Sequence, residues 1–600
     1  MLDHLGDLKR THHCGELRSE HVGQTVTLLG WVAKRRDLGN LTFVDIRDRW
    51  GLTQLVLDPE YNADAHAKAK NLRSEFVIGI VGNVRARSEN TINNKLATGN
   101  IEVFVNELFV LNHAATPPFP IKDDVEGVGE ELRLKHRYLD LRRPALQKNF
   151  LLRHKLTMAV RNYLDTKQFV ELETPILTKS TPEGARDYLV PSRVHKGSFY
   201  ALPQSPQIFK QLFMVSGFER YFQIARCFRD EDLRADRQPE FTQIDMEMSF
   251  VQRDDVYALL EGMMAELMRV IGVEIEAPFQ RLPYERAMDD YGSDKPDLRY
   301  DMKLNDLSDK VADCGFGVFA DCVANNGRVK AVCAPGAASK SRKEIESLES
   351  WLKQDYGIRG LAWLKYTEKG VSGPIKKFLG EDLCRELFTI SGGGEGDILF
   401  FVADAREKAN QALGALRCRL AEMLDMIPEN TFKFLWVTDF PLVEFDDDSA
   451  RYVALHHPFT SPLDEDLELL KEDPSQVRAK AYDLVLNGFE IGGGSIRIHR
   501  RDIQDAMFKA LGLSEEEAEE KFGFLLNALS YGAPPHGGIA LGLDRIAMLM
   551  ANEKSLRDVI AFPKTTSAYC MMTDSPSRVS VDQLVDLGIT VLHAHKDKEN

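Results

Sequence analysis

Three segments rich in glycine or arginine stand far apart in this chain, at residues 228–245, 487–499 and 537–545. A long block, residues 299–428, separates the first segment from the other two. This block has strand-rich stretches and one clear helix, but no catalytic groups gather in it. A single hydrophobic core does not accommodate 600 residues. The pattern therefore predicts a catalytic domain that is interrupted by an inserted domain.

The N-terminal part predicts a small β-barrel. Residues 24–57 contain three β-branched and aromatic stretches broken by turn sequences, and strand-like sequence returns at 76–86 and 101–111. Five strands with a helix after the third are typical of the OB fold. Alternation places Phe43 on one face with Asp45. Phe43 is either a stacking platform for a nucleic-acid base or a core residue, and both interpretations stay open.

Composition excludes several classes of protein. No apolar run approaches the ~20 residues that cross a bilayer, and the first ten residues lack the apolar core of a signal peptide. We therefore expect a cytoplasmic protein with no membrane partner. The eight cysteines form no C-x-x-C pair, which disfavours a zinc ribbon. A net charge of −16 argues against a protein that coats nucleic acid without specificity, but it permits local basic patches that bind a particular nucleic acid.

The segment 228–245 predicts a strand that carries Arg229 and Glu231, then an arginine-rich loop, then a second strand. Such a hairpin offers a forked cation to a phosphate and a carboxylate to an amine. The alternative is a charged, solvated hairpin. It does not explain two opposite charges placed on one face of a strand between apolar residues, so we favour the functional interpretation.

The other two segments place glycines beside reactive side chains. Glu490 precedes three glycines and Arg497, which suits a ligand that lies against the backbone. Glu490 could hold Mg²⁺ together with Asp483. Glycines also precede Asp544 and Arg545 at the start of an apolar helix, which suits a nucleotide. A glycine-rich bulged strand or turn is the structural alternative. The missing Lys-Ser/Thr ending excludes a Walker ATPase.

Smaller sites add an acidic turn with Glu183 and a helix start with Gln207 and Lys210. Two adjacent histidines, His456 and His457, lie in a predicted loop. Adjacent residues do not share a helix face, which disfavours a zinc site, and a loop histidine is usually solvated.

In this order and spacing, the segments resemble the signature motifs of class II aminoacyl-tRNA synthetases. FVELETPIL (169–177) resembles motif 1 of the dimer interface, the hairpin resembles motif 2, and GIALGLDR (538–545) resembles motif 3. The whole chain resembles the bacterial aspartyl type, also through LPQSPQIFKQ, HHPF and GGGSIRIH. The resemblance implies an α+β multidomain fold. It has an N-terminal OB-fold β-barrel and a class II antiparallel-sheet catalytic domain with an inserted α+β domain.

The resemblance also implies domain bounds. They are an OB-fold anticodon-binding domain (1–115), a hinge (116–145), the catalytic domain (146–298 and 429–566), an inserted bacterial-type domain (299–428) and a C-terminal extension (567–600).

Residue roles follow from the same resemblance. The implied catalytic residues are Arg229, Glu231 and Arg545. The implied aspartate-binding residues are Glu183, Gln207, Lys210, Arg229, Asp245, His456 and Arg497. The implied ATP-binding residues are Arg229, Glu231, Gln238, Phe241, Glu490, Gly542, Leu543, Asp544 and Arg545, with Asp483 and Glu490 for the metal. The implied tRNA contacts are Arg36, Phe43, Gln54 and Glu102 for the anticodon and Leu38 for specificity.

The implied activity is that of an aspartate–tRNA ligase, a homodimer that uses ATP and Mg²⁺. It activates L-aspartate to aspartyl-adenylate, releases pyrophosphate, and esterifies the 3′ end of tRNA(Asp). An anionic side chain needs fixed cations, and Lys210 and Arg497 supply them. A lysine pocket would need the opposite charge, and an asparagine pocket would need no second cation.

Alternatives stay open at this point. Leu38 favours strict specificity for tRNA(Asp), whereas a relaxed enzyme also charges tRNA(Asn). The rival enzymes are an asparaginyl or lysyl synthetase and a paralogue that forms an amide without tRNA. A non-catalytic OB-fold protein that binds nucleic acid is the rival from another class.

Overall fold

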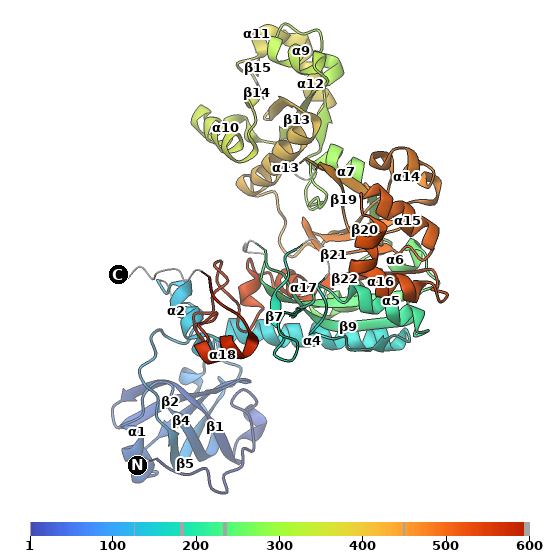
Figure 1. The fold of residues 1–600 in the computed structure, drawn as a ribbon. Coiled ribbons are helices and arrows are strands. Elements are labelled where there is room, and N and C mark those ends of the chain that lie inside the picture. Colours follow the sequence, from blue (N-terminus) through green and yellow to red (C-terminus); the bar gives the residue numbers. More distant parts are fainter. Residues whose placement is uncertain (1, 125–126, 181–184, 232–236, 448–449, 593–600) are drawn as a thin grey trace. The chain divides into compact units, whose positions relative to one another are not determined.

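The computed structural model describes residues 2–124, 127–180, 185–231, 237–447 and 450–592 (Figure 1). The chain forms two compact units. One comprises Met1–Leu151 with Arg557–Ser577, and the other comprises Leu152–Leu556 with Arg578–Asn600. Within the described ranges, no helix is long and apolar enough to cross a membrane.

The first unit contains a closed five-stranded barrel with the strand order β1-β2-β3-β5-β4. Its elements are β1 (Thr25–Leu38), β2 (Leu41–Asp48), β3 (Gly51–Leu57), α1 (Ala63–Ala69), β4 (Val77–Ala86) and β5 (Ile101–Asn112). Burial alternates along β2, so that Val44 and Ile46 enter the barrel core while Phe43 faces outward. The predicted barrel, with its helix after the third strand, is confirmed. Three helices follow it: α2 (Glu130–Lys135), α3 (Arg137–Asp140) and α4 (Pro144–Thr166).

An eight-stranded sheet forms the centre of the second unit, with the order β11-β17-β20-β21-β22-β10-β9-β6. The pairs at its two edges are parallel, and the strands between them pair antiparallel. Its strands are β6 (Val170–Glu171), β9 (Arg220–Phe228), β10 (Glu240–Ser249), β11 (Gln280–Pro283), β17 (Phe434–Thr438), β20 (Ala481–Leu486), β21 (Phe489–Ile496) and β22 (His536–Gly542).

Helices pack on this sheet, with α5 against β9 and β10, α17 against β10, and α6 against β22. Two small hairpins complete the unit. The helices are α5 (Gln207–Val215), α6 (Arg253–Val270), α14 (Leu469–Glu472), α15 (Arg501–Ala510), α16 (Glu515–Leu529), α17 (Leu543–Met550) and α18 (Val581–Leu587). The hairpins are β7 (Leu189–Pro191) with β8 (Phe199–Ala201), and β18 (Val443–Asp446) with β19 (Arg451–Ala454).

A separate five-stranded sheet, in the order β12-β13-β16-β14-β15, interrupts the second unit and has its own hydrophobic clusters. The chain leaves the large sheet after β11 and α7 (Tyr284–Tyr291) and returns at β17, the neighbour of β11. Entry and exit therefore lie side by side, as a tolerated insertion requires. Its strands are β12 (Leu304–Asp306), β13 (Arg328–Ala334), β14 (Ala362–Thr367), β15 (Gly370–Ser372) and β16 (Ile398–Asp404). Its helices are α8 (Ser308–Val311), α9 (Gly317–Ala324), α10 (Arg342–Tyr356), α11 (Lys376–Leu379), α12 (Glu381–Ile390) and α13 (Arg406–Met423).

Candidate active site

A cavity of about 630 Å³ opens over the middle strands of the large sheet. This volume is in the range of small-molecule sites. The predicted residues that line it are Gln207, Lys210, Arg229, Glu231, Gln238, Phe241, Asp245, His456, Asp483, Glu490, Arg497, Gly542, Asp544 and Arg545. Leu543 is buried at the start of α17 and is not part of the lining. Glu183 lies outside the described residues.

The glycines of the two glycine-rich segments make room for charged side chains and for a neighbouring backbone. A Cβ atom at Gly538 of β22 would lie 2.1 Å from a carboxylate oxygen of Glu247, and one at Gly493 of β21 would lie 2.6 Å from Oδ1 of Asp483. A Cβ atom at Gly494 would lie 2.1 Å from the carbonyl oxygen of Gly538. Only glycine therefore fits at these positions beside the carboxylates.

Two buried cations and two buried carboxylates form one cluster, of which Lys210, Asp245 and Arg497 line the cavity and Glu247 does not. Nζ of Lys210 lies 2.8 Å from Oδ2 of Asp245 and 3.2 Å from Oε2 of Glu247. Nε of Arg497 lies 3.1 Å from Oε1 of Glu247, and its Nη1 donates to Ser495 at 2.8 Å. Burial raises the pKa of Asp245 to about 6, although Lys210 opposes the shift. At Glu247, burial favours a higher pKa, but the charges of Arg497 and Lys210 outweigh it and hold the pKa of this carboxyl below its usual value.

Glu247 is a site residue that the sequence analysis missed. The cations Lys210 and Arg497 were expected to face a substrate on their own, whereas protein carboxylates partly neutralise both. The signal was present in the sequence, because Asp245 and Glu247 stand two apart on one strand and so share a face.

Several buried polar atoms in the cavity wall have no hydrogen-bond partner in the described part of the chain. They are Nε2 of Gln207, Nε of Arg229, Oδ1 of Asp245, Nδ1 of His456 and Nε2 of His457. Buried polar groups are usually paired, and each one left unpaired costs free energy. Such atoms in one cavity indicate that a polar ligand completes them.

His457 is a second residue that the sequence analysis missed. The backbone N–H of Phe459 donates to Nδ1 of His457, at 3.3 Å, so the neutral ring carries its proton on Nε2. Burial, together with the neighbouring Arg497 and Lys210, lowers the pKa of His457 to about 3. The ring is therefore an uncharged donor within the cavity wall, and the expectation of a solvated loop histidine is wrong.

Replacing His457 by leucine is expected to weaken the binding of an anionic ligand beside it, and so to raise the KM for such a substrate by about 10- to 100-fold, the effect of losing one hydrogen bond to a charged group. Binding at the Arg545 end of the cavity should stay unchanged. His457→Gln places an amide donor near Nε2 and should recover most of the affinity. His195→Leu, at an exposed position, is the control. A His457→Leu enzyme with a wild-type KM would contradict the role.

The hairpin residues Arg229 and Glu231 lie just beyond the end of β9, not within a strand as expected. The backbone N–H of Arg229 donates to the carbonyl of Pro239, at 2.9 Å, which closes the loop. The guanidinium of Arg229 lies 5.1 Å from the ring centre of Phe241 on β10. Glu231 forms an ion pair with Arg237 at 3.0 Å. The loop, not strand alternation, therefore aims these side chains into the cavity.

At the other end of the cavity, Arg545 donates to the carbonyl oxygen of Glu490. The carboxylate of Asp544 accepts from the backbone N–H of Thr242, at 2.7 Å, and pairs with Arg153. Asp544 thus fastens the start of α17 to β10. Both carboxylate oxygens of Asp544 therefore have partners within the protein, although the residue borders the cavity.

Asp483 and Glu490 lie close together, since a Cβ atom at Gly493 would be 2.6 Å from Oδ1 of Asp483 and 3.7 Å from Oε1 of Glu490. The charge of Asp483 is the largest cause that raises the pKa of Glu490. Nε2 of His456 lies 3.6 Å from Oδ1 of Asp483. Burial opposes the shift, but Asp483 holds the pKa of His456 above its usual value. No group of three or more metal-binding side chains occurs among the residues that the structure describes. Two carboxylates fit a magnesium ion, which keeps waters and substrate oxygens as its other ligands.

On the barrel, the predicted anticodon residues form a line across neighbouring strands. Arg36 donates to Asp45 at 2.7 Å and to Gln54 at 3.3 Å, and Gln54 donates to Glu102 at 3.1 Å. Phe43 pairs in register with Arg36 and belongs to the outward face. This outcome rules out the core interpretation of Phe43.

The family described as tRNA synthetases class II (D, K and N) matches residues 129–566, and the family described as OB-fold nucleic acid binding domain matches residues 26–111. The chain belongs to the class II tRNA synthetases.

Curated relatives of this synthetase share most of its length. The Aspartate–tRNA(Asp/Asn) ligases of Bacillus cereus (strain G9842) and Bacillus mycoides (strain KBAB4) are each 58% identical over 583 residues, which is 97% of this chain and 98% of theirs. The fold is shared by the asparaginyl-tRNA synthetase of Pyrococcus horikoshii, with a TM-score of 0.58 at 19% identity, over 93% of this chain and 98% of the other. A putative aspartyl-tRNA synthetase from Leishmania major Friedlin has a TM-score of 0.57 at 19% identity, over 94% and 96%.

Proposed function

We propose that this synthetase is an aspartate–tRNA ligase, which activates L-aspartate with ATP and transfers the aspartyl group to the 3′ end of tRNA. The family and the 58% identical relatives support this function, since the relatives carry the name of an aspartate–tRNA ligase. The cytoplasmic location that we expect from the sequence stays a prediction.

The unpaired polar atoms of the cavity are the observation that supports aspartate as the amino-acid substrate. Asp245 offers one buried carboxylate oxygen, while Gln207, Arg229 and His457 offer donors. One acceptor suits the α-ammonium group of aspartate, and the donors suit its two carboxylates. Lys210 and Arg497 then stabilise the side-chain carboxylate. A substrate with a cationic side chain would instead face the positive charges of Lys210 and Arg497.

In the first step the α-carboxylate of aspartate attacks the α-phosphorus of ATP, the bond to the leaving pyrophosphate breaks, and aspartyl-adenylate forms. Arg229 neutralises the charge shared by the attacking carboxylate and the α-phosphate, and Arg545 binds the terminal phosphates. Phe241 stacks on the adenine. In the second step the terminal ribose hydroxyl of tRNA attacks the adenylate carbonyl, and AMP leaves.

Asp483 and Glu490 would hold a magnesium ion. Their mutual repulsion, and the Gly493 position that leaves space beside Oδ1 of Asp483, fit a bound cation. When bound, magnesium supplies positive charge to the phosphates of ATP.

The decisive test is ATP–pyrophosphate exchange with one amino acid at a time. We expect exchange with aspartate and none above background with asparagine or lysine at the same concentration. Exchange that depends on asparagine or on lysine would instead identify the protein as an asparaginyl or a lysyl synthetase. No exchange with any amino acid would support a non-catalytic protein that binds nucleic acid.

Relaxed tRNA specificity is the second part of the proposal. Leu38 favoured strict charging of tRNA(Asp), but the curated relatives are named for both tRNA(Asp) and tRNA(Asn). Leu38 ends β1 and is 72% exposed, so it is free to touch a tRNA without altering the barrel core. We therefore propose that the enzyme charges both tRNAs.

Purified tRNA(Asn) should accept aspartate from this enzyme, and the product should release aspartate on mild alkaline hydrolysis. Leu38→His should change the ratio of kcat/KM for the two tRNAs, while pyrophosphate exchange stays at the wild-type rate. If tRNA(Asn) stays uncharged at enzyme concentrations that charge tRNA(Asp) completely, the enzyme is strict and Leu38 gave the better prediction.

A homodimer is the proposed assembly. The edge strand β6 leaves one side of the large sheet without a partner strand in the described chain. Val170, Ile176 and Leu177 in and after this strand are 43%, 50% and 52% exposed. An open edge with exposed apolar side chains is typical of an interface.

A further inference from the structure

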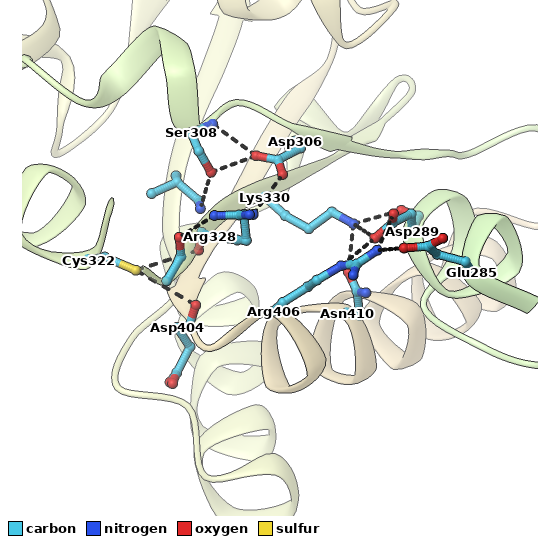
Figure 2. A network of polar contacts seen from close by, with 12 residues as sticks. Glu285, Asp289, Asp306, Ser308, Cys322, Arg328, Lys330, Asp404, Arg406 and Asn410 are labelled. Atoms are coloured by element: carbon cyan, nitrogen blue, oxygen red, sulfur yellow. Dashed lines mark hydrogen bonds and ion pairs between the residues drawn. The ribbon is translucent and has the colours of Figure 1, made fainter. Parts of the chain in front are cut away.

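A partly buried polar network joins the inserted domain to α7 (Figure 2). Lys330 of β13 has a 2% exposed side chain, and its Nζ lies 2.8 Å from the carbonyl oxygen of Asp289 and 2.6 Å from Oδ1 of Asn410. Arg406, at the start of α13, contacts the two carboxylate oxygens of Asp289 at 3.1 and 2.6 Å. Asp289 on α7 is therefore held by two cations of the inserted domain.

Beyond α7, the two parts meet backbone against backbone. Gly292 ends α7 with a φ of +67°, and a Cβ atom there would lie 2.1 Å from the carbonyl oxygen of Asn410. A Cβ atom at Gly414 of α13 would lie 2.6 Å from the carbonyl oxygen of Gly292. This contact leaves no room for a side chain, so α13 fixes where the chain leaves α7.

Arg417, one turn further along α13, holds the chain that follows. Its side chain is buried, and it donates to the carbonyl oxygens of Asp297 at 2.7 Å, Tyr300 at 3.0 Å and Met302 at 2.7 Å. The guanidinium also lies over the rings of Tyr291 and Tyr300, at 5.0 and 4.2 Å from their centres. One side chain thus fixes both ends of the segment 292–300.

This segment forms part of the wall of the active-site cavity. Asp294 lines the cavity together with Glu490. The charges of Asp294 and Lys295 both act on the pKa of Glu490. At the far end, Asp297 packs beside Gly488, in the turn that leads into β21.

We propose that the inserted domain sets the nucleotide end of the active site, with Arg417 as a positioning residue that places Asp294 in the cavity wall. The inference rests on the proposed activation of aspartate by ATP. Asp294 accepts hydrogen bonds there from hydroxyl groups of the bound nucleotide or of water. A change in Arg417 therefore acts on nucleotide binding through Asp294 and leaves the aspartate end of the cavity unchanged.

The test is a double-mutant cycle measured by ATP–pyrophosphate exchange. Arg417→Met should raise the KM for ATP by about 5- to 20-fold, the size of coupling between contacting groups. The KM for aspartate should stay within twofold. Asp294→Asn should also raise the KM for ATP, and Arg417→Met should add little in the Asp294→Asn background. Arg419→Met is the matched control, because Arg419 lies on the same helix and stacks on Trp351 of the inserted domain.

Hydrogen exchange gives a readout that does not depend on activity. Amides of residues 292–302 should exchange faster in Arg417→Met than in wild type or Arg419→Met, without a change in β13 or β16. In Arg417→Lys, the exchange rates of these amides should lie between those of wild type and Arg417→Met, since lysine keeps the positive charge but lacks the forked guanidinium. If Arg417→Met does not fold, Arg406→Gln removes the exposed contact to Asp289 and should raise the KM for ATP in the same direction.

Three outcomes would overturn the inference: a KM for ATP within twofold of wild type in both Arg417→Met and Arg406→Gln, equal rises in the KM for ATP and for aspartate, or an undiminished effect of Arg417→Met in the Asp294→Asn background. Failure of the proposed function itself has a different signature, because the wild-type enzyme would then show no aspartate-dependent exchange.

Discussion

Alanine in place of Arg229 is expected to reduce the kcat of aspartate-dependent pyrophosphate exchange by about 10²- to 10³-fold, equivalent to about 2.7–4 kcal/mol of transition-state stabilisation. The reason is that the guanidinium faces the cavity beside Phe241 with an unpaired, buried Nε, as far as the described chain shows. Thermal stability should stay close to wild type, since Arg229 forms no ion pair with any residue that the structure describes.

The matched control for this change is Arg226→Ala. Arg226 lies on β9, shortly before Arg229 in the chain, is exposed, and pairs with Glu240 away from the cavity. Exposed ion pairs of this kind contribute about 0–1 kcal/mol, so exchange should remain at the wild-type level. Exchange by Arg229→Ala within a few-fold of wild type would refute the catalytic role of Arg229.

Leucine in place of Arg497 is expected to abolish aspartate-dependent exchange and to destabilise the fold by about 3–5 kcal/mol, because it leaves a buried carboxylate without one of its two cations. Arg497→Lys keeps a charge beside Glu247 and should recover most of the stability. The KM for aspartate should stay high in Arg497→Lys, because lysine lacks the second donor. Urea unfolding and exchange kinetics measure the two effects separately.

The stability loss in Arg497→Leu should depend on pH. In the wild type, the pKa of Glu247 lies below its usual value of 4.5, so the charged pair stabilises the fold above that pH and loses its contribution as the pH falls through the lowered pKa. The difference between wild type and variant should therefore stay nearly constant from pH 7 down to about pH 4.5 and should shrink as the pH falls further. Arg500→Leu, which breaks an exposed pair with Asp502, is the control and should cost far less. A pH-independent difference would contradict this account of Glu247.

Much of the fold followed from local patterns in the sequence. The barrel followed from β-branched runs between turns, and the insertion followed from a block without catalytic groups. Phe43 shows where pattern alone stops, because alternation assigned it to a face but not to the inside or the outside of the barrel. Pairing of five strands decides that question, and pairing partners far apart in the chain leave no local signal.

In the active site, too, local features could be predicted from the sequence and contacts between distant segments could not. Individual cations and glycines were identified from the sequence, but their partners were not. Alternation in β10 gave Glu247 the same face as Asp245, yet its pairing with Arg497 needs three strands to come together. His457 was assigned to solvent because loop histidines usually lie there, and only the packing of its loop against Lys210 and Arg497 shows otherwise.

The pairing of β10 with β22 also has a consequence for synthesis of the chain. Glu247 on β10 lies opposite Gly538 on β22 in this pairing. The ribosome therefore synthesises the carboxylates Asp245 and Glu247 long before it synthesises β22. The ribosome therefore has to release nearly all of the catalytic sequence before a substrate can be held. Until then Asp245 and Glu247 remain accessible to water, and a truncated product that lacks β22 has no pocket. Such distant pairing is slow to form, so assembly of the pocket comes late in folding.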